Sequence, residues 1–296
     1  MHNIHRTHQK FCDYILAFKG LTPRTIKGYK EVFRYFIKAC PVNEVKEVTQ
    51  FMIEDWLMEG KLEKDWSAKT IRNRLLALRS FFKWCTERGM IEKDPTEYIP
   101  KPKLPKSLPK SLSLSDAEKL LDWTKHMKYY YKSERTRAIA IIATFLYTGI
   151  RLDELYSLKY KNVDLEHKVL LVVSGKGQKD RKIPINSSLS LILQKYISER
   201  NKRGVHCPYF FVSLRADAKM SRNVVKRLVL KLRERTGIYF YAHMLRHTFA
   251  TLMLEGGCNL YTLSKLMGHS DIKTTTIYLA TTTAHLHEEI CKHPLY

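Results

Sequence analysis

The sequence lacks a segment that could cross a membrane or direct secretion. The longest apolar run, AIAIIATFLYTGI from Ala138 to Ile150, is far shorter than the ~20 residues that a transmembrane helix needs. The opening residues, MHNIHRTHQKF, contain no apolar stretch typical of a secretory signal. We therefore expect a cytoplasmic protein that has no membrane partner.

Paired cysteines are also missing. The six cysteines are scattered along the chain and form no CxxC pair, which argues against both a disulfide framework and a zinc site. The sequence contains no GxxxxGK[ST] loop for ATP and no compelling carboxylate cluster for Mg²⁺. We expect no metal and no cofactor. Basic side chains would then have to stabilise the charge of any phosphoryl-transfer transition state.

Positive charge, in contrast, is abundant. The chain has 52 Lys and Arg residues against 29 Asp and Glu residues, a net charge of +23. Residues 1–110 carry +9 and the remainder +14, so the excess is not confined to a tail. Two basic folded halves suit a polyanion held between them, because each neutralised phosphate releases counterions. The alternative is a basic protein that is merely soluble.

A proline-rich segment divides the sequence. YIPKPKLPKSLPKSLSLS, residues 98–115, has four closely spaced prolines with lysines between and around them. Such spacing excludes a regular helix and favours extended geometry. We predict a helical N-terminal domain over residues 1–98, a linker over 99–113 and a catalytic domain over 114–296.

The residues before the linker have helical periodicity. Apolar side chains recur every three or four positions in residues 21–40 and again in residues 67–89. Ser67 is a candidate N-cap for the second helix and Gly89 a candidate C-cap. The opposite face of that helix carries Lys69, Arg72, Arg79 and Lys83, which either contact phosphates or face solvent.

The period changes once after the linker. A capped helix begins near Ser113, and residues 135–149 are apolar enough for a buried helix. Residues 168–173 and 181–185 then have the pattern of short strands on either side of a Gly-rich turn, SGKGQKD. The remainder is helical again. The predicted fold is mainly α: a helical first domain followed by a mixed α/β domain with a small antiparallel sheet.

Four polar clusters in the second domain can carry chemistry. Arg151 directly follows the buried helix, Lys176 lies between two glycines of the turn, His243 and Arg246 share a helical face, and His269 follows Gly268. Each has a structural alternative: an ion pair for Arg151, a solvated turn for Lys176, and capping or core packing for the two histidines.

Together these clusters describe a phosphate site. Two arginines can clamp the oxygens of a phosphodiester with bidentate donors, and two histidines can donate to the same oxygens or exchange protons. Tyr278, close behind His269, supplies the missing nucleophile. The structural alternative for Tyr278 is a core residue, since the chain has seventeen tyrosines.

These residues resemble the tyrosine recombinases, the phage-integrase family. TGIRLDEL, GKGQKDRKIPI, HMLRHTFAT and LMGHSDIKTTTIY look like the four catalytic boxes of that family, in family order. The stretch from Ser67 to Pro95 resembles the core-binding domain of the same family. The acid-rich EDWLMEGKLEKDW and the final CKHPLY match nothing diagnostic.

The resemblance implies a catalytic set of Arg151, Lys176, His243, Arg246, His269 and Tyr278. Tyr278 would attack the scissile phosphate, form a 3′-phosphotyrosyl link and release a 5′-hydroxyl. Glu154 would orient Arg151. Lys176 would be the general acid, with Lys179, Arg181 and Lys182 as competitors, and His247 would be supporting or structural.

The resemblance also implies partners. We expect two domains that clamp duplex DNA, and a homo- or hetero-tetramer on paired binding sites. A Xer-like resolvase of chromosome or plasmid dimers is the first choice, and an integrase of a phage or mobile element is the alternative. A type IB topoisomerase and a non-catalytic DNA-binding protein are the remaining alternatives. All six catalytic residues are present, which argues against the last.

Overall fold

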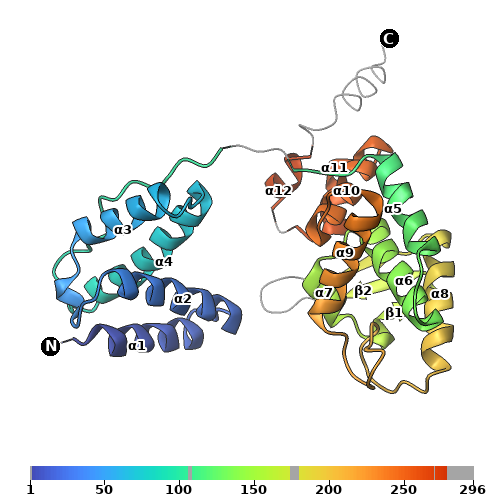
Figure 1. Ribbon diagram of the computed structural model, residues 1–296, viewed down its shortest axis with the longest axis horizontal. Coiled ribbons are helices and arrows are strands. Elements are labelled where there is room, and N and C mark those ends of the chain that lie inside the picture. The colour runs from blue at the N-terminus through green and yellow to red at the C-terminus, as the bar shows by residue number, and fades with distance from the viewer. Residues whose placement is uncertain (1, 106–108, 174–179, 270, 279–296) are drawn as a thin grey trace, which may run out of the picture. The chain divides into compact units, whose positions relative to one another are not determined.

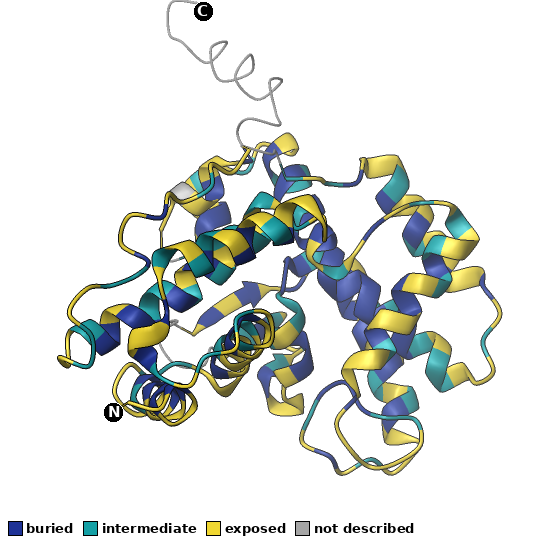
Figure 2. Cartoon of the chain, turned by 60° about the vertical axis from the view of Figure 1, so that its left-hand side comes forward, coloured by how far each residue is buried: buried dark blue, intermediate teal, exposed yellow. Residues whose placement is uncertain are grey.

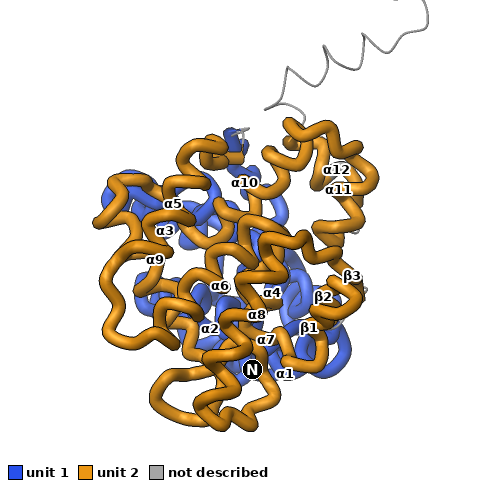
Figure 3. Tube along the Cα trace, turned by 90° about the vertical axis from the view of Figure 1, so that its right-hand side faces the viewer, with its two compact units in different colours: residues 1–106 blue, residues 107–296 orange. Residues whose placement is uncertain are grey.

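The computed structural model of the chain describes residues 2–105, 109–173, 180–269 and 271–278, without the side chain of Lys273. The chain forms two compact units, Met1–Lys106 and Ser107–Tyr296 (Figure 3), and each has its own hydrophobic core. Throughout the described ranges, every helix is too short or too polar to span a bilayer.

The first unit is a bundle of helices (Figure 1). A short 3₁₀ turn, Val45–Glu47, precedes the third helix. The side chains of Asn3, Thr22, Thr49 and Ser67 accept hydrogen bonds from first-turn N–H groups and so fix where the helices begin. The helices are α1 (Ile4–Ala17), α2 (Pro23–Ala39), α3 (Gln50–Leu62) and α4 (Ala68–Thr86).

Aromatic rings fill the core of the first unit. Phe81 packs against both Phe11 and Phe33, and the buried His8 ring stacks on Phe33 with 3.8 Å between centroids. Burial, and then the charges of Lys30 and His5, lower the pKa of His8 to about 3. His8 is therefore a neutral core residue at physiological pH.

The two helices predicted in this unit form close to the expected positions. Ser67 caps α4 as predicted, whereas Gly89 lies beyond the helix end in a left-handed turn. Arg79, expected on the outer face of α4, instead donates to the carbonyls of Thr96 and Ile99 at 2.6 and 2.7 Å. Arg79 thus holds the segment that leads out of the unit.

The second unit is built around one buried helix, α6 (Lys132–Thr148), which packs against α5, α8 and α10. In Figure 2 the buried positions follow the inner faces of the helices, and the outer faces are exposed. A short 3₁₀ turn, Tyr160–Asn162, precedes the sheet. The other helices are α5 (Leu114–His126), α7 (Leu152–Ser157), α8 (Ser187–Asn201), α9 (Arg222–Thr236), α10 (Ala242–Glu255), α11 (Leu260–Met267) and α12 (Lys273–Thr276).

A small antiparallel sheet of order β1-β2-β3 completes this unit. β2 (Val169–Val172) and β3 (Arg181–Pro184) are the predicted hairpin, with Leu170 opposite Ile183 and Val172 opposite Arg181. β1 (Val163–Asp164) was not predicted. The mainly helical fold with a small antiparallel sheet is confirmed. The hairpin tip with Lys176 lies outside the described residues.

The proline-rich segment forms neither helix nor strand over residues 99–105 and 109–113. Ile99 packs into the core of the first unit and Leu112 into that of the second. The N–H of Leu112 donates to Thr248 Oγ1 at 2.9 Å, which fixes the entry to the second unit.

Candidate active site

Two left-handed glycines bring the polar clusters together. Gly149 ends α6 with φ +59° and Gly268 ends α11 with φ +64°. A side chain at either position would be strained, and its Cβ would lie 2.3 Å from Phe249 or 2.8 Å from Arg181 Cδ. Gly149 directs the chain to Arg151 and Gly268 directs it to His269. Helix endings therefore determine where these two side chains lie.

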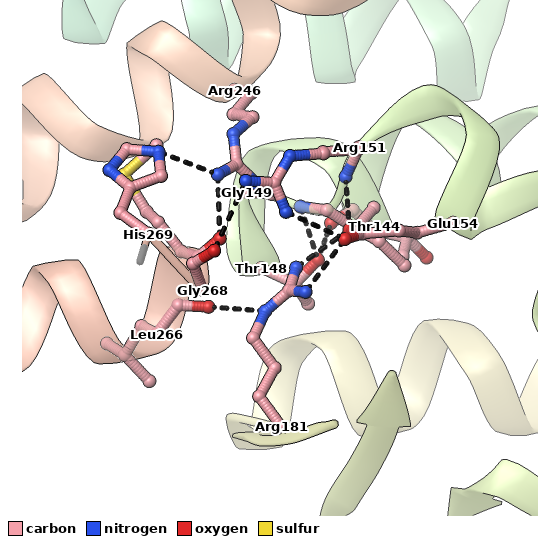
Figure 4. Close-up of polar contacts among 12 residues, drawn as sticks. Thr144, Thr148, Gly149, Arg151, Glu154, Arg181, Arg246, Leu266, Gly268 and His269 are labelled. Carbon is pink, nitrogen blue, oxygen red and sulfur yellow. Dashed lines mark hydrogen bonds and ion pairs between the residues drawn. The ribbon is translucent and has the colours of Figure 1, made fainter. Parts of the chain in front are cut away.

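Glu154 is the carboxylate at the centre of the site. It accepts from the backbone N–H of Arg151 at 2.8 Å and from Arg151 Nη1 at 2.9 Å. It also accepts two bonds from the Arg181 guanidinium, at 2.8 and 2.7 Å (Figure 4). Burial opposes ionisation, but the bonds and charge of Arg181, with those of Arg151, outweigh it and lower the pKa of Glu154 to about 2. Glu154 is thus a permanent anion that fixes two guanidinium groups.

Arg181 is buried and hydrogen-bonded within the second unit rather than exposed to solvent. Besides the pair with Glu154, its Nε donates to Leu266 O at 2.9 Å, and the side chain is only 7% exposed. It lies in phase with the buried Ile183 of β3. Arg181 was considered as a competitor for the general acid. Arg181 is buried and its N–H groups already donate to Glu154 and Leu266 O. It therefore connects the sheet to α7 and to the end of α11.

Arg246 is the most deeply buried cation of the site, with a residue exposure of 2%. Its Nη1 donates to Gly149 O at 2.5 Å, and its Nη2 donates to Met267 O at 2.7 Å and to His269 Nε2 at 3.0 Å. Burial, and then the charge of Arg151, lower the pKa of Arg246 to about 9. The guanidinium therefore stays charged at neutral pH.

The contact with Arg246 fixes the proton on His269. Because a guanidinium can only donate, Nε2 of His269 accepts, and Nδ1 donates to Thr275 Oγ1 at 2.7 Å. Burial, and then the charges of Arg246, Arg151 and Arg181, lower the pKa of His269 to about 4. His269 is neutral at pH 7. Figure 4 shows its contact with Arg246, and its bond to Thr275 connects the end of α11 to α12.

His243 and His247 lie one turn apart on α10. Their rings meet edge to face with 4.5 Å between centroids. His243 is exposed, and partial desolvation followed by the charges of Arg246 and Arg151 lowers its pKa. Burial, and then His243 and Arg246, lower the pKa of His247 to about 4. Both rings are therefore neutral at pH 7.

Tyr278 follows α12 and is 2% exposed. Its ring packs with Phe249, Leu263 and other apolar residues of α10 and α11. Its Oη lies 2.7 Å from His247 Nδ1. Burial raises the pKa of Tyr278 above its usual value, although Arg246 and Arg151 oppose the shift. The phenol is thus protonated at neutral pH, close to two guanidinium groups.

The structure brings together residues that are far apart in the sequence. Arg246 contacts His269 directly, Arg151 donates to Gly268 O at 3.2 Å, and Tyr278 reaches α10 through His247. Lys176 lies outside the described residues. Sequence reasoning did not anticipate the ties made by Arg181 and His247. Among the side chains described, no three His, Cys, Asp or Glu are grouped to hold a metal ion.

Comparison with known proteins assigns this chain. The Phage integrase family matches residues 110–285, and the phage integrase N-terminal SAM-like domain matches residues 8–92. The chain belongs to the phage integrase family. Tyrosine recombinase XerA of Pyrococcus horikoshii is 32% identical over 97% of this chain and 93% of its own length. Tyrosine recombinase XerC of Escherichia coli is 28% identical over 97% and 95%.

Solved structures share the fold. The crystal structure of XerA recombinase covers 98% of both chains at 27% identity, with a TM-score of 0.55. XerH recombinase bound to a palindromic difH substrate covers 96% of this chain and 83% of that one at 22% identity, with a TM-score of 0.75. The resemblance to the tyrosine recombinases is confirmed. The chain is an enzyme of site-specific recombination and similar to the Xer recombinases.

Proposed function

We propose that Tyr278 is the nucleophile with which this recombinase cuts and rejoins duplex DNA. The observation that supports the proposal is the convergence described above. Arg246 hydrogen-bonds directly to His269, Arg151 donates to the carbonyl of the neighbouring Gly268, and the Tyr278 phenol lies close to both arginines. In this proposal, Arg151 and Arg246 hold the scissile phosphate, His243 donates to one of its oxygens, and His269 holds the Arg246 guanidinium in place.

The charges of the site suit a phosphodiester. Arg151 and Arg181 pair with Glu154, and Arg246 lies close enough to interact with all three, so these four side chains together carry a net positive charge in a partly desolvated place. Such fixed donors stabilise the negative charge of a phosphoryl transition state without reorganising. The Arg151 side chain is 28% exposed and Arg246 is 2% exposed. Arg151 is thus the more accessible donor, and Arg246 is almost fully buried, where it also donates to the carbonyls of Gly149 and Met267.

The proposed reaction is a transesterification. Tyr278 Oη attacks phosphorus and forms a 3′-phosphotyrosyl ester, and the 5′-oxygen leaves as a hydroxyl. Lys176 is the proposed donor of the proton to that oxygen. The ester retains the energy of the broken bond, so a 5′-hydroxyl from another strand can attack it and restore DNA.

We further propose that the enzyme acts on paired duplex sites as a homo- or hetero-tetramer and resolves chromosome or plasmid dimers. The named relatives support this choice, because Xer recombinases are prominent among them. An integrase would use the same chemistry on the DNA of a phage or mobile element.

The experiment has two stages. The protein is incubated with sheared host DNA and denatured in SDS, and the DNA that remains covalently attached is sequenced. The DNA sequence recovered in this way is called the trapped site below. Two directly repeated trapped sites are then placed in a supercoiled plasmid. Resolution into two circles supports dimer resolution, whereas relaxation without paired sites would support the topoisomerase alternative.

A further inference from the structure

His247 is not part of the proposed catalytic set, yet it contacts the proposed nucleophile, Tyr278. His247 Nδ1 and Tyr278 Oη are 2.7 Å apart, within the range of a good hydrogen bond. Tyr278 is almost fully buried, and His247 is partly buried beside it. The contact therefore joins His247 to the same oxygen that would attack phosphorus.

The two neighbouring histidines have other positions. Both ring nitrogens of His269 are engaged, one with Arg246 and one with Thr275. His243 lies one turn before His247 on α10, is exposed, and meets the His247 ring edge to face. Of these three rings, His247 is the one with a described hydrogen bond to the Tyr278 oxygen.

The protonation states fit a proton transfer from tyrosine to histidine. The groups that face His247 are His243 and Arg246 on α10, His269 after α11 and Tyr278 after α12. Burial and positive neighbours keep the His247 imidazole neutral at pH 7, and burial keeps the phenol protonated. A protonated phenol is a weak nucleophile, so its proton must leave as it attacks.

We propose that His247 is a further catalytic residue, the base that accepts the phenolic proton when Tyr278 Oη attacks phosphorus. The inference rests on the proposed function of Tyr278. The Oη–P bond forms, the bond between phosphorus and the 5′-oxygen breaks, and the phenolic proton moves to His247 Nδ1 while Nε2 keeps its own. The departing 5′-oxygen takes a proton from the general acid, for which Lys176 is the candidate. In the rejoining step, His247 returns its proton to Tyr278.

In this proposal, the phosphodiester of the DNA allows a positive imidazole to form beside the arginines. In the free protein, Arg246 and His243 disfavour a charge on His247. A phosphodiester brings a negative charge to the same place, and the transition state brings more. Imidazolium is thus stabilised most when the proton arrives, which is what a general base requires.

Two substitutions separate proton transfer from mere positioning. In His247→Asn, the side-chain oxygen is as many bonds from Cα as Nδ1, so it can accept from Tyr278 Oη but is not basic. His247→Ala removes both abilities. The exposed His167, which pairs with Asp164 far along the chain from these residues, provides the matched control His167→Ala.

The assay is covalent cleavage of a nicked duplex that carries the trapped site, measured from pH 6 to 9. We expect both His247 variants to cleave about 10²–10⁴-fold more slowly at pH 7, the usual contribution of general base catalysis. Their rates should rise about tenfold per pH unit, because hydroxide must then remove the proton. Wild type and His167→Ala should have the same, flatter profile. Gel shifts with the same duplex and circular dichroism check binding and folding.

Three outcomes decide the question. A wild-type rate in His247→Asn would overturn the proposal and leave His247 as a positioning residue. Slow variants that keep the wild-type pH profile would also overturn it. A wild-type protein that forms no covalent adduct with any duplex would instead defeat the proposed function itself, so the two failures are distinguishable.

Discussion

A methyl group at Gly268 should damage the site through Arg181. Gly268 has φ +64°, and a Cβ there would lie 2.8 Å from Arg181 Cδ and 3.1 Å from its Nε. Arg181 cannot move freely, because it donates to Glu154 and to Leu266 O. Gly268→Ala therefore combines a left-handed Ala with displacement of a buried ion pair.

Gly237 offers a matched control for the backbone cost alone. It ends α9 with φ +70°, and a Cβ there would have nothing within 4 Å. A left-handed Ala costs about 1–2 kcal/mol, which is the loss expected for Gly237→Ala. Breaking a buried pair costs roughly 3–5 kcal/mol, and a partial displacement a fraction of that. We expect Gly268→Ala to lose about 2–4 kcal/mol in total.

Urea-dependent hydrogen exchange of peptides from α6 and α10 measures the free energy of unfolding of the second unit, and cleavage of the trapped site measures activity. Gly268→Ala should lose both, because Arg151 also donates to Gly268 O and His269 follows directly. Gly237→Ala should keep near-normal cleavage. Equal losses of stability in the two variants would refute the role given to Arg181.

The pKa values of His247 and His269 lie near 4 in the folded state against 6.5, so the unfolded chain binds more protons between those values. The contribution of these two histidines to the free energy of unfolding should thus be fully present above pH 6.5 and should fall between pH 6.5 and pH 4. At pH 5 the loss should be of order 1 kcal/mol for each partly exposed histidine, as urea titration can measure. A free energy of unfolding that does not change over this range would contradict the burial of these rings. Lys176→Ala should slow cleavage about 10²–10⁴-fold, and a bridging 5′-sulfur, which leaves without a proton, should restore the rate for Lys176→Ala but not for Arg151→Ala. DNA affinity should fall steeply as the salt concentration rises. Replacing Lys101 and Lys103 should weaken binding to specific and to random duplexes alike, as gel shifts can show. A loss of affinity confined to the specific duplex would mean that these lysines recognise the DNA sequence.

The features that local sequence encodes were predicted well. Ser67 and Ser113 have the cap positions that their residue type favours, and the hairpin around the Gly-rich turn follows from period-two patterning. The helical face shared by His243 and Arg246 needed only the spacing of three.

The tertiary ties could not be predicted in the same way. The pair of Arg181 with Glu154 depends on how β3 approaches α7, and the contact of His247 with Tyr278 depends on how the segment after α12 packs on α10. One signal was present for Arg181: it alternates in phase with the buried Ile183, which places a charge on the inner face of a strand. For His247 the spacing of four from His243 gave the face of the helix but not the partner.

If Tyr278 forms the covalent bond to DNA, it is the residue that carries the DNA in the trapped complex. The wild-type protein is trapped on a nicked duplex, digested with protease and nuclease, and analysed by mass spectrometry. We expect a nucleotide adduct on the peptide that contains Tyr278. Tyr278→Phe should form no SDS-stable complex but should still shift the duplex in gels. An adduct on another residue, or an SDS-stable complex that persists in Tyr278→Phe, would contradict this role of Tyr278.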